Sequence, residues 1–392
     1  MTEKVLNETE LLLDALRLGQ TAAGWQAECG HANANLDALA VRAIVLGLAP
    51  QLHHRLAAWH ITLPPRAAAK LAVTYQAQEQ RSAAIFSQLA EVLKACAENG
   101  LKPIALKGVH LAGLVYAAPA LRPMNDIDLL FTPEELPSAE HLLETLGYGG
   151  KHKSAAVGPG VVKHTSTYQR DANSAATSNP YLSTESARMI EPHSSLEESW
   201  FGLKVDVTPG VHERAAEAVL AQQPVRILSI EDLVLHLSVH LCFHIIAGAP
   251  AMVQLLDLKA VTQLNVNWAV VASRARATRA TPFVLAALTL AHKLLDTPLP
   301  AEISGLAHTV PSGLRRYIAE LGLPHLLRRT QQKPLTSVAE RIRRGLSDRA
   351  ETARWTGNWG EWARVWLTAI NINKTDTGRL LAKQVIAKIR TS

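Results

Sequence analysis

The fold is decided by residues 105–111, ALKGVHL, and residues 121–130, LRPMNDIDLL. Residues 103–106 form a short apolar run between turn residues, which is typical of a buried strand, and residues 127–131 predict a second strand. A short helix over residues 110–116 and a loop over residues 117–123 are expected between them. Side chains alternate along a strand, so Asp126 and Asp128 point the same way, with Cα atoms about 6.6 Å apart.

Two carboxylates on one face of a strand suit a divalent metal site. Ile127, Leu129 and Phe131 are expected on the opposite, buried face, so a rigid element presents both acids. Mg²⁺ is normally held by one or two carboxylates, with waters and substrate phosphates completing its shell. Gly108 ends a strand and starts a helix, where free backbone N–H groups favour a phosphate, and Lys107 adds a positive charge. This pattern indicates phosphoryl-transfer chemistry.

Composition predicts a folded chain without an export signal. Of 392 residues, 48% are hydrophobic and 19% charged, which excludes the composition of a disordered protein. The three cysteines are far apart with no CxxC pair, so neither a disulfide framework nor a thiolate zinc cluster is expected, and a cytoplasmic location fits best. The first residues lack the pattern of a signal peptide.

The most apolar stretch, residues 233–258, is interrupted by three histidines and Pro250. We interpret it as a buried helical region rather than a membrane span, and expect no membrane partner.

Charge is unevenly distributed along the chain. Residues 311–392 contain 16 Lys+Arg and 6 Asp+Glu, a net charge of +10, whereas the whole chain carries +6. The basic C-terminal region is a candidate contact for a polyanion, and solvated helix faces are the simpler interpretation.

Periodicity predicts an α+β fold in four parts. We expect an N-terminal helical region (1–99), a core of strands and helices (100–227) with an insertion at about 149–186, a helical domain that closes a cleft (228–310), and a basic C-terminal helical region (311–392). Within the core, residues 161–168 and 187–193 are strand-like and residues 171–186 form a loop. Helix caps are expected at Thr132, with Pro133 in the first helical position and Glu135 completing the box, and at Ser229.

These residues resemble the family of uncharacterised nucleotidyltransferases, a branch of the DNA polymerase beta-like nucleotidyltransferase superfamily. The resemblance lies in Lys107-Gly108, Tyr116, residues 121–123 and residues 126–130, and it extends over about residues 80–300. Residues 190–196 resemble the family's Glu-x-His strand, and residues 228–233 with His236 and His240 resemble its next helix; residues 255–258 and Trp268 resemble later elements. The resemblance implies a small mixed sheet of nucleotidyltransferase type, flanked by N-terminal and C-terminal helical regions.

The resemblance also implies roles for individual residues. Asp126 and Asp128 would bind metal, and Gly108 would contact the nucleotide phosphate; the superfamily's usual Gly-Ser is Lys-Gly here, so the serine role has no occupant. A third carboxylate would complete the metal site and activate the acceptor, and either Glu191 or Asp206 matches it. Glu191 is favoured because His193 follows at the expected offset, although Ser194 replaces the family's aromatic residue.

Other polar residues carry two interpretations each. Arg122 would neutralise triphosphate charge or form an ion pair with a strand carboxylate. His236, His240 and His244 share one helix face, a spacing that permits zinc, but their apolar surroundings favour core histidines, with His240 lining the cleft. Asp257 is favoured as a structural residue over a cleft residue.

The sequence therefore predicts a transferase that uses Mg²⁺ (or Mn²⁺) and moves a nucleoside monophosphate from an NTP to an unidentified acceptor, which is a small molecule, peptide or RNA. Pyrophosphate would be released. An RNA-directed enzyme of the same fold, such as a tRNA-modifying toxin, is the first alternative, and a catalytically silent interaction protein is the second.

Overall fold

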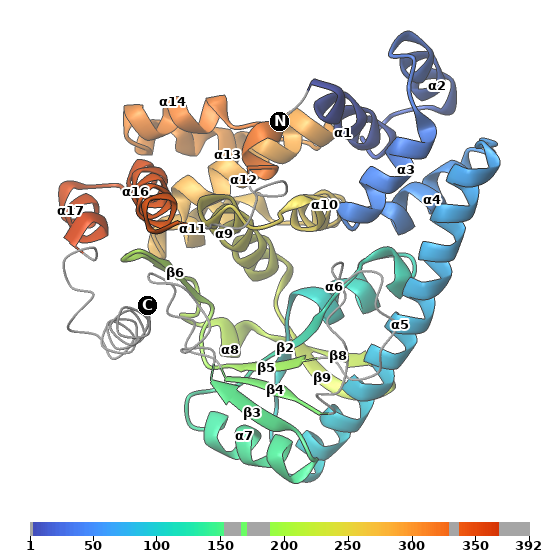
Figure 1. Cartoon of the computed structure of the whole chain (residues 1–392). Helices are drawn as coiled ribbons and strands as arrows, with labels where there is room; N and C mark the ends of the chain where they lie inside the picture. Colours follow the sequence, from blue (N-terminus) through green and yellow to red (C-terminus); the bar gives the residue numbers. More distant parts are fainter. Residues whose placement is uncertain (1–2, 153–165, 171–188, 329–336, 368–392) are drawn as a thin grey trace.

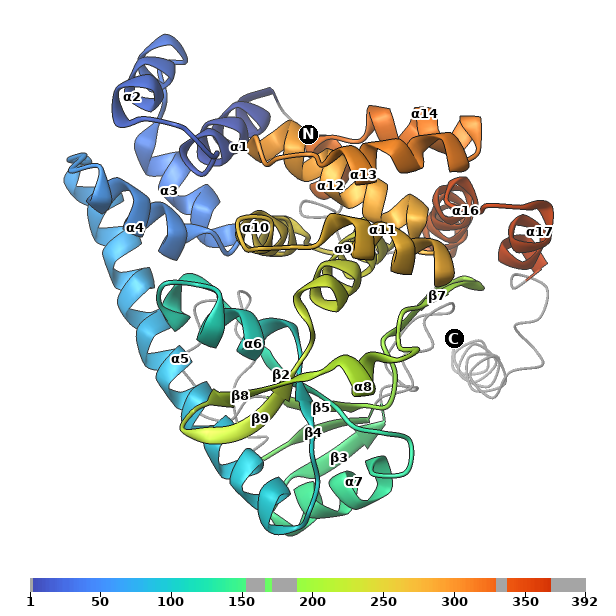
Figure 2. The same ribbon diagram turned by 180° about the vertical axis from the view of Figure 1, so that it is seen from behind.

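The computed structural model describes residues 3–152, 166–170, 189–328 and 337–367. It confirms the α+β fold: a mixed sheet with helices against it makes one part, and a larger assembly of helices makes the other (Figure 1). A long N-terminal helix runs along the side of the molecule from the helical part to the sheet, as the reverse view also shows (Figure 2).

The N-terminal region is helical, as predicted for residues 1–99. Residues 36–58 form two helices and not one, because Gly47 adopts a φ of +73° and Pro50 lies in the first turn of the next helix. The last of these helices spans 34 residues. The helices are α1 (Glu3–Ala15), α2 (Ala22–His31), α3 (Leu36–Val45), α4 (Ala49–Ala58) and α5 (Pro65–Glu98).

Seven strands form the main sheet, in the order β3-β4-β5-β2-β1-β9-β8. β2 runs parallel to β5 and β1 runs parallel to β9, while the other neighbouring pairs are antiparallel. A separate two-stranded sheet is made by β6 (Glu197–Trp200) and β7 (Leu203–Asp206). The main strands are β1 (Ile104–Ala105), β2 (Asp126–Leu130), β3 (Gly149–His152), β4 (Ser166–Gln169), β5 (Met189–His193), β8 (Ala216–Leu220) and β9 (Gln223–Ile227).

The predicted strands of the core are present, with shifted ends. The run at 103–106 gives β1, and 127–131 gives β2. Of the strand-like segment at 161–168, residues 166–168 lie in β4, and residues 161–165 lie outside the described part of the chain. The segment at 187–193 corresponds to β5, and the loop expected at 171–186 also lies outside the described residues. Three elements connect or flank these strands: α6 (Lys107–Leu114), the short 3-10 helix η1 (Pro119–Leu121) and α8 (Val211–Arg214).

The helix expected to start after Thr132 begins later than predicted. Thr132 and Glu135 do bond reciprocally: Glu135 N donates to Thr132 Oγ1 (3.2 Å) and Thr132 N donates to Glu135 Oε2 (3.0 Å). However, residues 133–135 form a turn, and the helix α7 is Leu136–Thr145. The box therefore shapes the approach to the helix, and Pro133 is not its first residue.

The second cap is confirmed. Ser229 Oγ accepts from Asp232 N (3.3 Å) at the start of α9 (Ile230–Ala247). Among the described residues, α9 is the helix long and apolar enough to cross a membrane, and 78% of it is buried within the protein, as predicted for a core helix.

Further helices continue to the end of the described chain, as predicted. They are α10 (Met252–Val261), α11 (Trp268–Ala277), α12 (Thr281–Leu295), α13 (Ala301–Ser304), η3 (Gly305–Thr309), α14 (Ser312–Glu320), α15 (Leu323–Leu326), α16 (Val338–Arg354) and α17 (Trp359–Leu367).

The two faces of β2 have different surroundings. Ile127, Leu129 and Phe131 are buried in a core that includes Ile85 of α5 and Leu143 of α7, so the face predicted to be apolar is packed against helices. Residues 126 and 128 project from the opposite face, toward the side where α9 lies. The apolar face thus fixes the position of the polar one.

We expect Leu129→Ala to destabilise the protein by about 2–5 kcal/mol, because Leu129 is fully buried and its truncation leaves a cavity between the sheet and α5. Urea unfolding followed by circular dichroism measures the change. Val73→Ala is the control: Val73 is 63% exposed on α5, and its loss should change stability by less than ~0.5 kcal/mol. Equal effects of the two substitutions would contradict this packing.

Candidate active site

Asp126 and Asp128 lie on the same face of β2, as predicted from strand alternation. Asp126 is half-buried and Asp128 is 4% exposed. Because the carboxylates stand on a central strand of the sheet, their spacing is fixed by the backbone rather than by a mobile loop.

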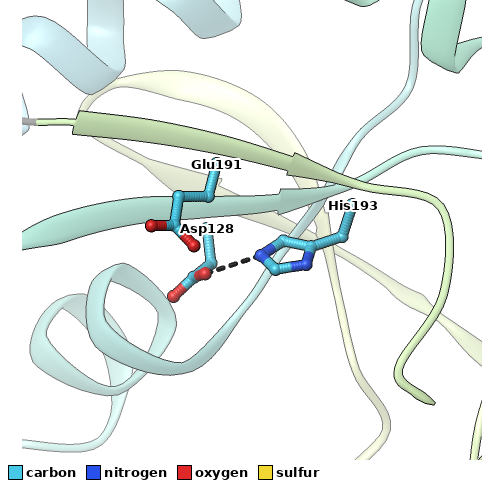
Figure 3. A group of neighbouring side chains, drawn as sticks. All are labelled: Asp128, Glu191 and His193. Carbon is cyan, nitrogen blue, oxygen red and sulfur yellow. Dashed lines mark hydrogen bonds and ion pairs between the residues drawn. The ribbon is translucent and has the colours of Figure 1, made fainter. Parts of the chain in front are cut away.

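The neighbouring strand supplies a third carboxylate. In the parallel register of β2 with β5, Asp128 pairs with Glu191, and Glu191 is 3% exposed. His193 follows two residues later on the same face, and its Nε2 donates to Asp128 Oδ1 at 2.7 Å. Figure 3 shows the three side chains converging from the two strands. The structure thus brings together Asp128, Glu191 and His193.

Lys107 faces the same carboxylates from the first residue of α6. Its Nζ lies 3.7 Å from Asp128 Oδ1, and the residue is 8% exposed. Burial alone would lower the pKa of Lys107, but four surrounding carboxylates outweigh burial and raise it, so the ammonium stays charged. These carboxylates belong to Asp128, Glu198, Asp126 and Glu191.

The backbone of Lys107 is strained. Its φ is +37°, a left-handed conformation that side-chain-bearing residues rarely adopt. The strained turn redirects the chain from β1 into α6 and keeps the ammonium against the acids. Strain of this kind persists where the surrounding structure holds it, often at functional sites.

Gly108 is required by its neighbours within the chain. A Cβ at this position would lie 2.9 Å from Arg122 Nη1 and 3.1 Å from Met124 Cβ. The loop before β2 therefore packs directly on the start of α6. The contact of Gly108 with a nucleotide phosphate stays a prediction.

Arg122 forms a buried ion pair with a helix carboxylate, Asp257, and the strand carboxylate of Asp126 adds a weaker charge interaction. Its Nη2 donates to Asp257 Oδ2 (2.7 Å) and its Nε to Asp257 Oδ1 (3.2 Å), while the Tyr116 hydroxyl donates to the same Oδ1 (2.9 Å). Burial would lower the pKa of Arg122, but Asp257 outweighs burial and raises it. This network ties the loop before β2 to α10, which supports the structural interpretation of Asp257.

The histidines of α9 divide into two kinds. His240 Nδ1 bonds to Glu198 Oε1 (2.7 Å) and His244 Nδ1 to the Pro250 carbonyl (2.7 Å). His236 is 2% exposed, and neither ring nitrogen has a hydrogen-bond partner in the described part of the chain.

The surroundings of His236 keep its ring neutral. Burial, with Lys107 second, lowers the pKa of His236 to about 3. Among the described residues, these three histidines do not form a metal-ligand cluster.

Asp206 lies apart from the acid pair. It is exposed at the end of β7 in the two-stranded sheet, and its Oδ1 accepts from Thr208 N at 2.9 Å. The geometry therefore puts Glu191, and not Asp206, beside Asp128.

His193, Glu198 and His236 were not predicted as site residues. The signal for His193 was present, because it follows Glu191 at the strand period of two. Glu198 and His236 approach the site from β6 and α9, and their proximity depends on tertiary packing.

The donor set fits a divalent cation. The ligand atoms of Asp128, Glu191 and His193 all lie within 4.8 Å of one another, and Asp126 projects from the same face of β2. Carboxylate oxygens suit Mg²⁺ and Mn²⁺, and His193, whose Nε2 donates to Asp128, would hold that carboxylate in place.

A mixed sheet with three acids on one face, beside a strand–turn–helix element, is the arrangement expected of a nucleotidyltransferase. The sequence model of the family described as uncharacterised nucleotidyltransferase matches residues 32–296, more than half of the chain, so the protein belongs to this family. This confirms the resemblance.

Other comparisons add little. No curated protein matches the chain in sequence. Among solved structures, it is similar to the solution structure of the antibiotic-resistance factor ANT(2'')-Ia, with 16% identity over 50% of this chain and 89% of that chain and a TM-score of 0.31. A TM-score this low does not establish a shared fold.

We expect Asp257→Asn to destabilise the protein by about 3–5 kcal/mol, because it leaves the buried Arg122 guanidinium without a counter-charge. Urea unfolding measures the loss. The double variant Arg122→Met/Asp257→Leu removes both charges and should regain most of the stability. If the double variant is as unstable as Asp257→Asn, the cost does not come from an unpaired charge.

Proposed function

We propose that this protein is a metal-dependent nucleotidyltransferase that moves a nucleoside monophosphate from an NTP to an acceptor hydroxyl or similar group. The observation that carries the proposal is the register of β2 and β5, which sets Asp128 beside Glu191 with Asp126 on the same face. Membership in a nucleotidyltransferase family supports it.

In this reaction the acceptor oxygen bonds to the α-phosphorus of the NTP, the bond to the bridging oxygen of the β-phosphate breaks, and pyrophosphate leaves. Asp126, Asp128 and Glu191 would hold Mg²⁺ or Mn²⁺. A divalent cation at such a site neutralises phosphate charge and stabilises the attacking and leaving oxygens. Glu191 would also take the acceptor's proton.

A positively charged side chain and neutral backbone N–H groups would bind the triphosphate. The Lys107 ammonium faces the acid cluster, and α6 begins at the same residue with free backbone N–H groups in its first turn, so both would bind phosphate oxygens. His193 orients the Asp128 carboxylate through the 2.7 Å hydrogen bond. Most of the catalytic effect would then come from positioning and charge stabilisation.

We expect Asp126→Asn, Asp128→Asn and Glu191→Gln each to lower transfer at least about 10²-fold, because each removes a carboxylate from the reacting centre while keeping its shape. The assay uses α-labelled NTPs, Mg²⁺ or Mn²⁺ and fractionated cell extract as the source of acceptors. Asp206→Asn is the matched control and should keep its activity, since Asp206 is exposed on a different sheet.

Two outcomes would overturn parts of the proposal. Loss of transfer in Asp206→Asn with full activity in Glu191→Gln would reassign the third carboxylate. Absence of transfer by the unaltered protein, together with no NTP binding by calorimetry, would favour a catalytically silent interaction protein.

Lys107 competes with a metal for Asp128, and this gives a second test. We expect Lys107→Met to raise the Mn²⁺ affinity of the nucleotide-free protein about tenfold, or ~1.4 kcal/mol, because an ammonium 3.7 Å from a ligand oxygen repels the cation. The same variant should bind NTP more weakly. Calorimetry measures both affinities.

The exposed Lys102, mutated to Met, is the control and should change neither affinity. Weaker Mn²⁺ binding by Lys107→Met would contradict competition, and would mean that the lysine chiefly keeps the carboxylates ionised.

A further inference from the structure

A cavity separate from the acid cluster lies among the two-stranded sheet and the C-terminal helices. Its volume is about 820 Å³, and it is bounded by β7, the end of α11, the start of α12 and α17. That size is typical of small-molecule sites. Lys107, Gly108, Asp126, Asp128 and Glu191 do not line it.

Cations outnumber acids in the lining of this cavity, six to four. Of the four acids in the lining, Glu197 pairs with Lys204 (2.8 Å) and Asp232 with Arg214 (2.8 Å). The other two accept from neutral groups: Glu361 from Gly357 N (2.8 Å) and Asp206 from Thr208 N (2.9 Å). The cations that line the cavity are Lys204, Arg214, Arg274, Arg276, Arg279 and Arg364.

Two of the arginines are held in place by one buried carboxylate. Arg214 donates to Asp232 from Nε (2.8 Å) and Nη2 (3.0 Å), and Arg274 Nη1 lies 3.0 Å from the same side chain. Asp232 is 2% exposed, whereas both arginines are partly exposed. A single buried acid thus orients two guanidinium groups in the cavity wall.

The other three arginines leave the lining with an excess of positive charge, since six cations and four acids line the cavity. Arg276, Arg279 and Arg364 are exposed and have no ion-pair partner in the described part of the chain. Arg279 adopts a φ of +58°, a conformation that favours glycine at the end of a helix.

Helix dipoles account for only part of this arrangement. Arg274 and Arg276 lie in the last turn of α11 and Arg364 in the last turn of α17, where cations are favourable. The helix dipoles do not explain why arginines from α11, from α17 and from the turn between α11 and α12 all line the same cavity.

We propose that this cavity is a second binding site, for a small molecule that carries phosphate groups. Guanidinium groups bind phosphate oxygens in bidentate geometry, and the exposed Arg276, Arg279 and Arg364 supply such donors at the cavity, next to the two guanidinium groups whose donors are engaged by Asp232. The site does not depend on the proposed function, because it shares no residue with the acid cluster.

The test is calorimetric binding of inorganic tripolyphosphate in the presence of EDTA, using the Asp126→Asn/Asp128→Asn protein so that the acid cluster cannot bind it through a metal. We expect the further triple substitution Arg276→Ala/Arg279→Ala/Arg364→Ala to weaken binding at least tenfold. The control triple, Arg66→Ala/Arg316→Ala/Arg343→Ala, removes three exposed arginines outside the cavity and should change affinity less than twofold.

Each other outcome overturns the proposal. Equal losses in both triples would mean attraction by net charge alone, and no loss in the cavity triple would mean that the cavity does not bind phosphate. Equally tight binding of citrate would remove the preference for phosphate. Binding of a short RNA but not of tripolyphosphate, lost only in the cavity triple, would replace the small molecule with a nucleic-acid backbone.

Discussion

The parallel register of β2 and β5 is the constraint on which the candidate active site depends. It places two carboxylates, Asp128 and Glu191, side by side where both are almost fully buried. Like charges in such a place are costly, and Lys107 and His193 offset the cost by reaching the same Asp128 oxygen. A one-residue shift of β5 against β2 would turn one acid toward the apolar face of the sheet, so the site forms only in the observed register.

The surroundings of β2 explain why the register is well determined. Ile127 and Leu129 pack against α5 and α7, and that packing allows only one face of the strand to be polar. On the other side, the Arg122–Asp257 pair fastens the preceding loop to α10, and Gly108 lets that loop lie directly on α6. β2 is therefore fixed by the packing of its apolar face and by the contacts of the loop that precedes it.

Local sequence patterns predicted those parts of the site that depend on residues close together in the sequence. Strand alternation was enough to place Asp126 and Asp128 on one face. The local offset between Glu191 and His193 favoured Glu191 over Asp206, but it did not show which strand pairs with β2, because that pairing joins residues far apart in the chain. Thr132 shows the same limit: its bonds with Glu135 formed as predicted, but the backbone made a turn before the helix began.

The arginine cavity and the acid cluster lie on opposite sides of β6, and α9 contributes side chains to both. The residue spacing along these two elements explains the arrangement. Along β6, Glu197 lines the arginine cavity while the next residue, Glu198, bonds to His240 on the other side, as strand alternation requires. Along α9, Asp232 holds the arginine pair, and His236, one turn later, lies beside the acid cluster. Asp232 also accepts from the Ser229 hydroxyl (2.9 Å) at the start of α9, so the side chain that holds the arginine pair belongs to the same capped first turn that begins the helix carrying His236 and His240.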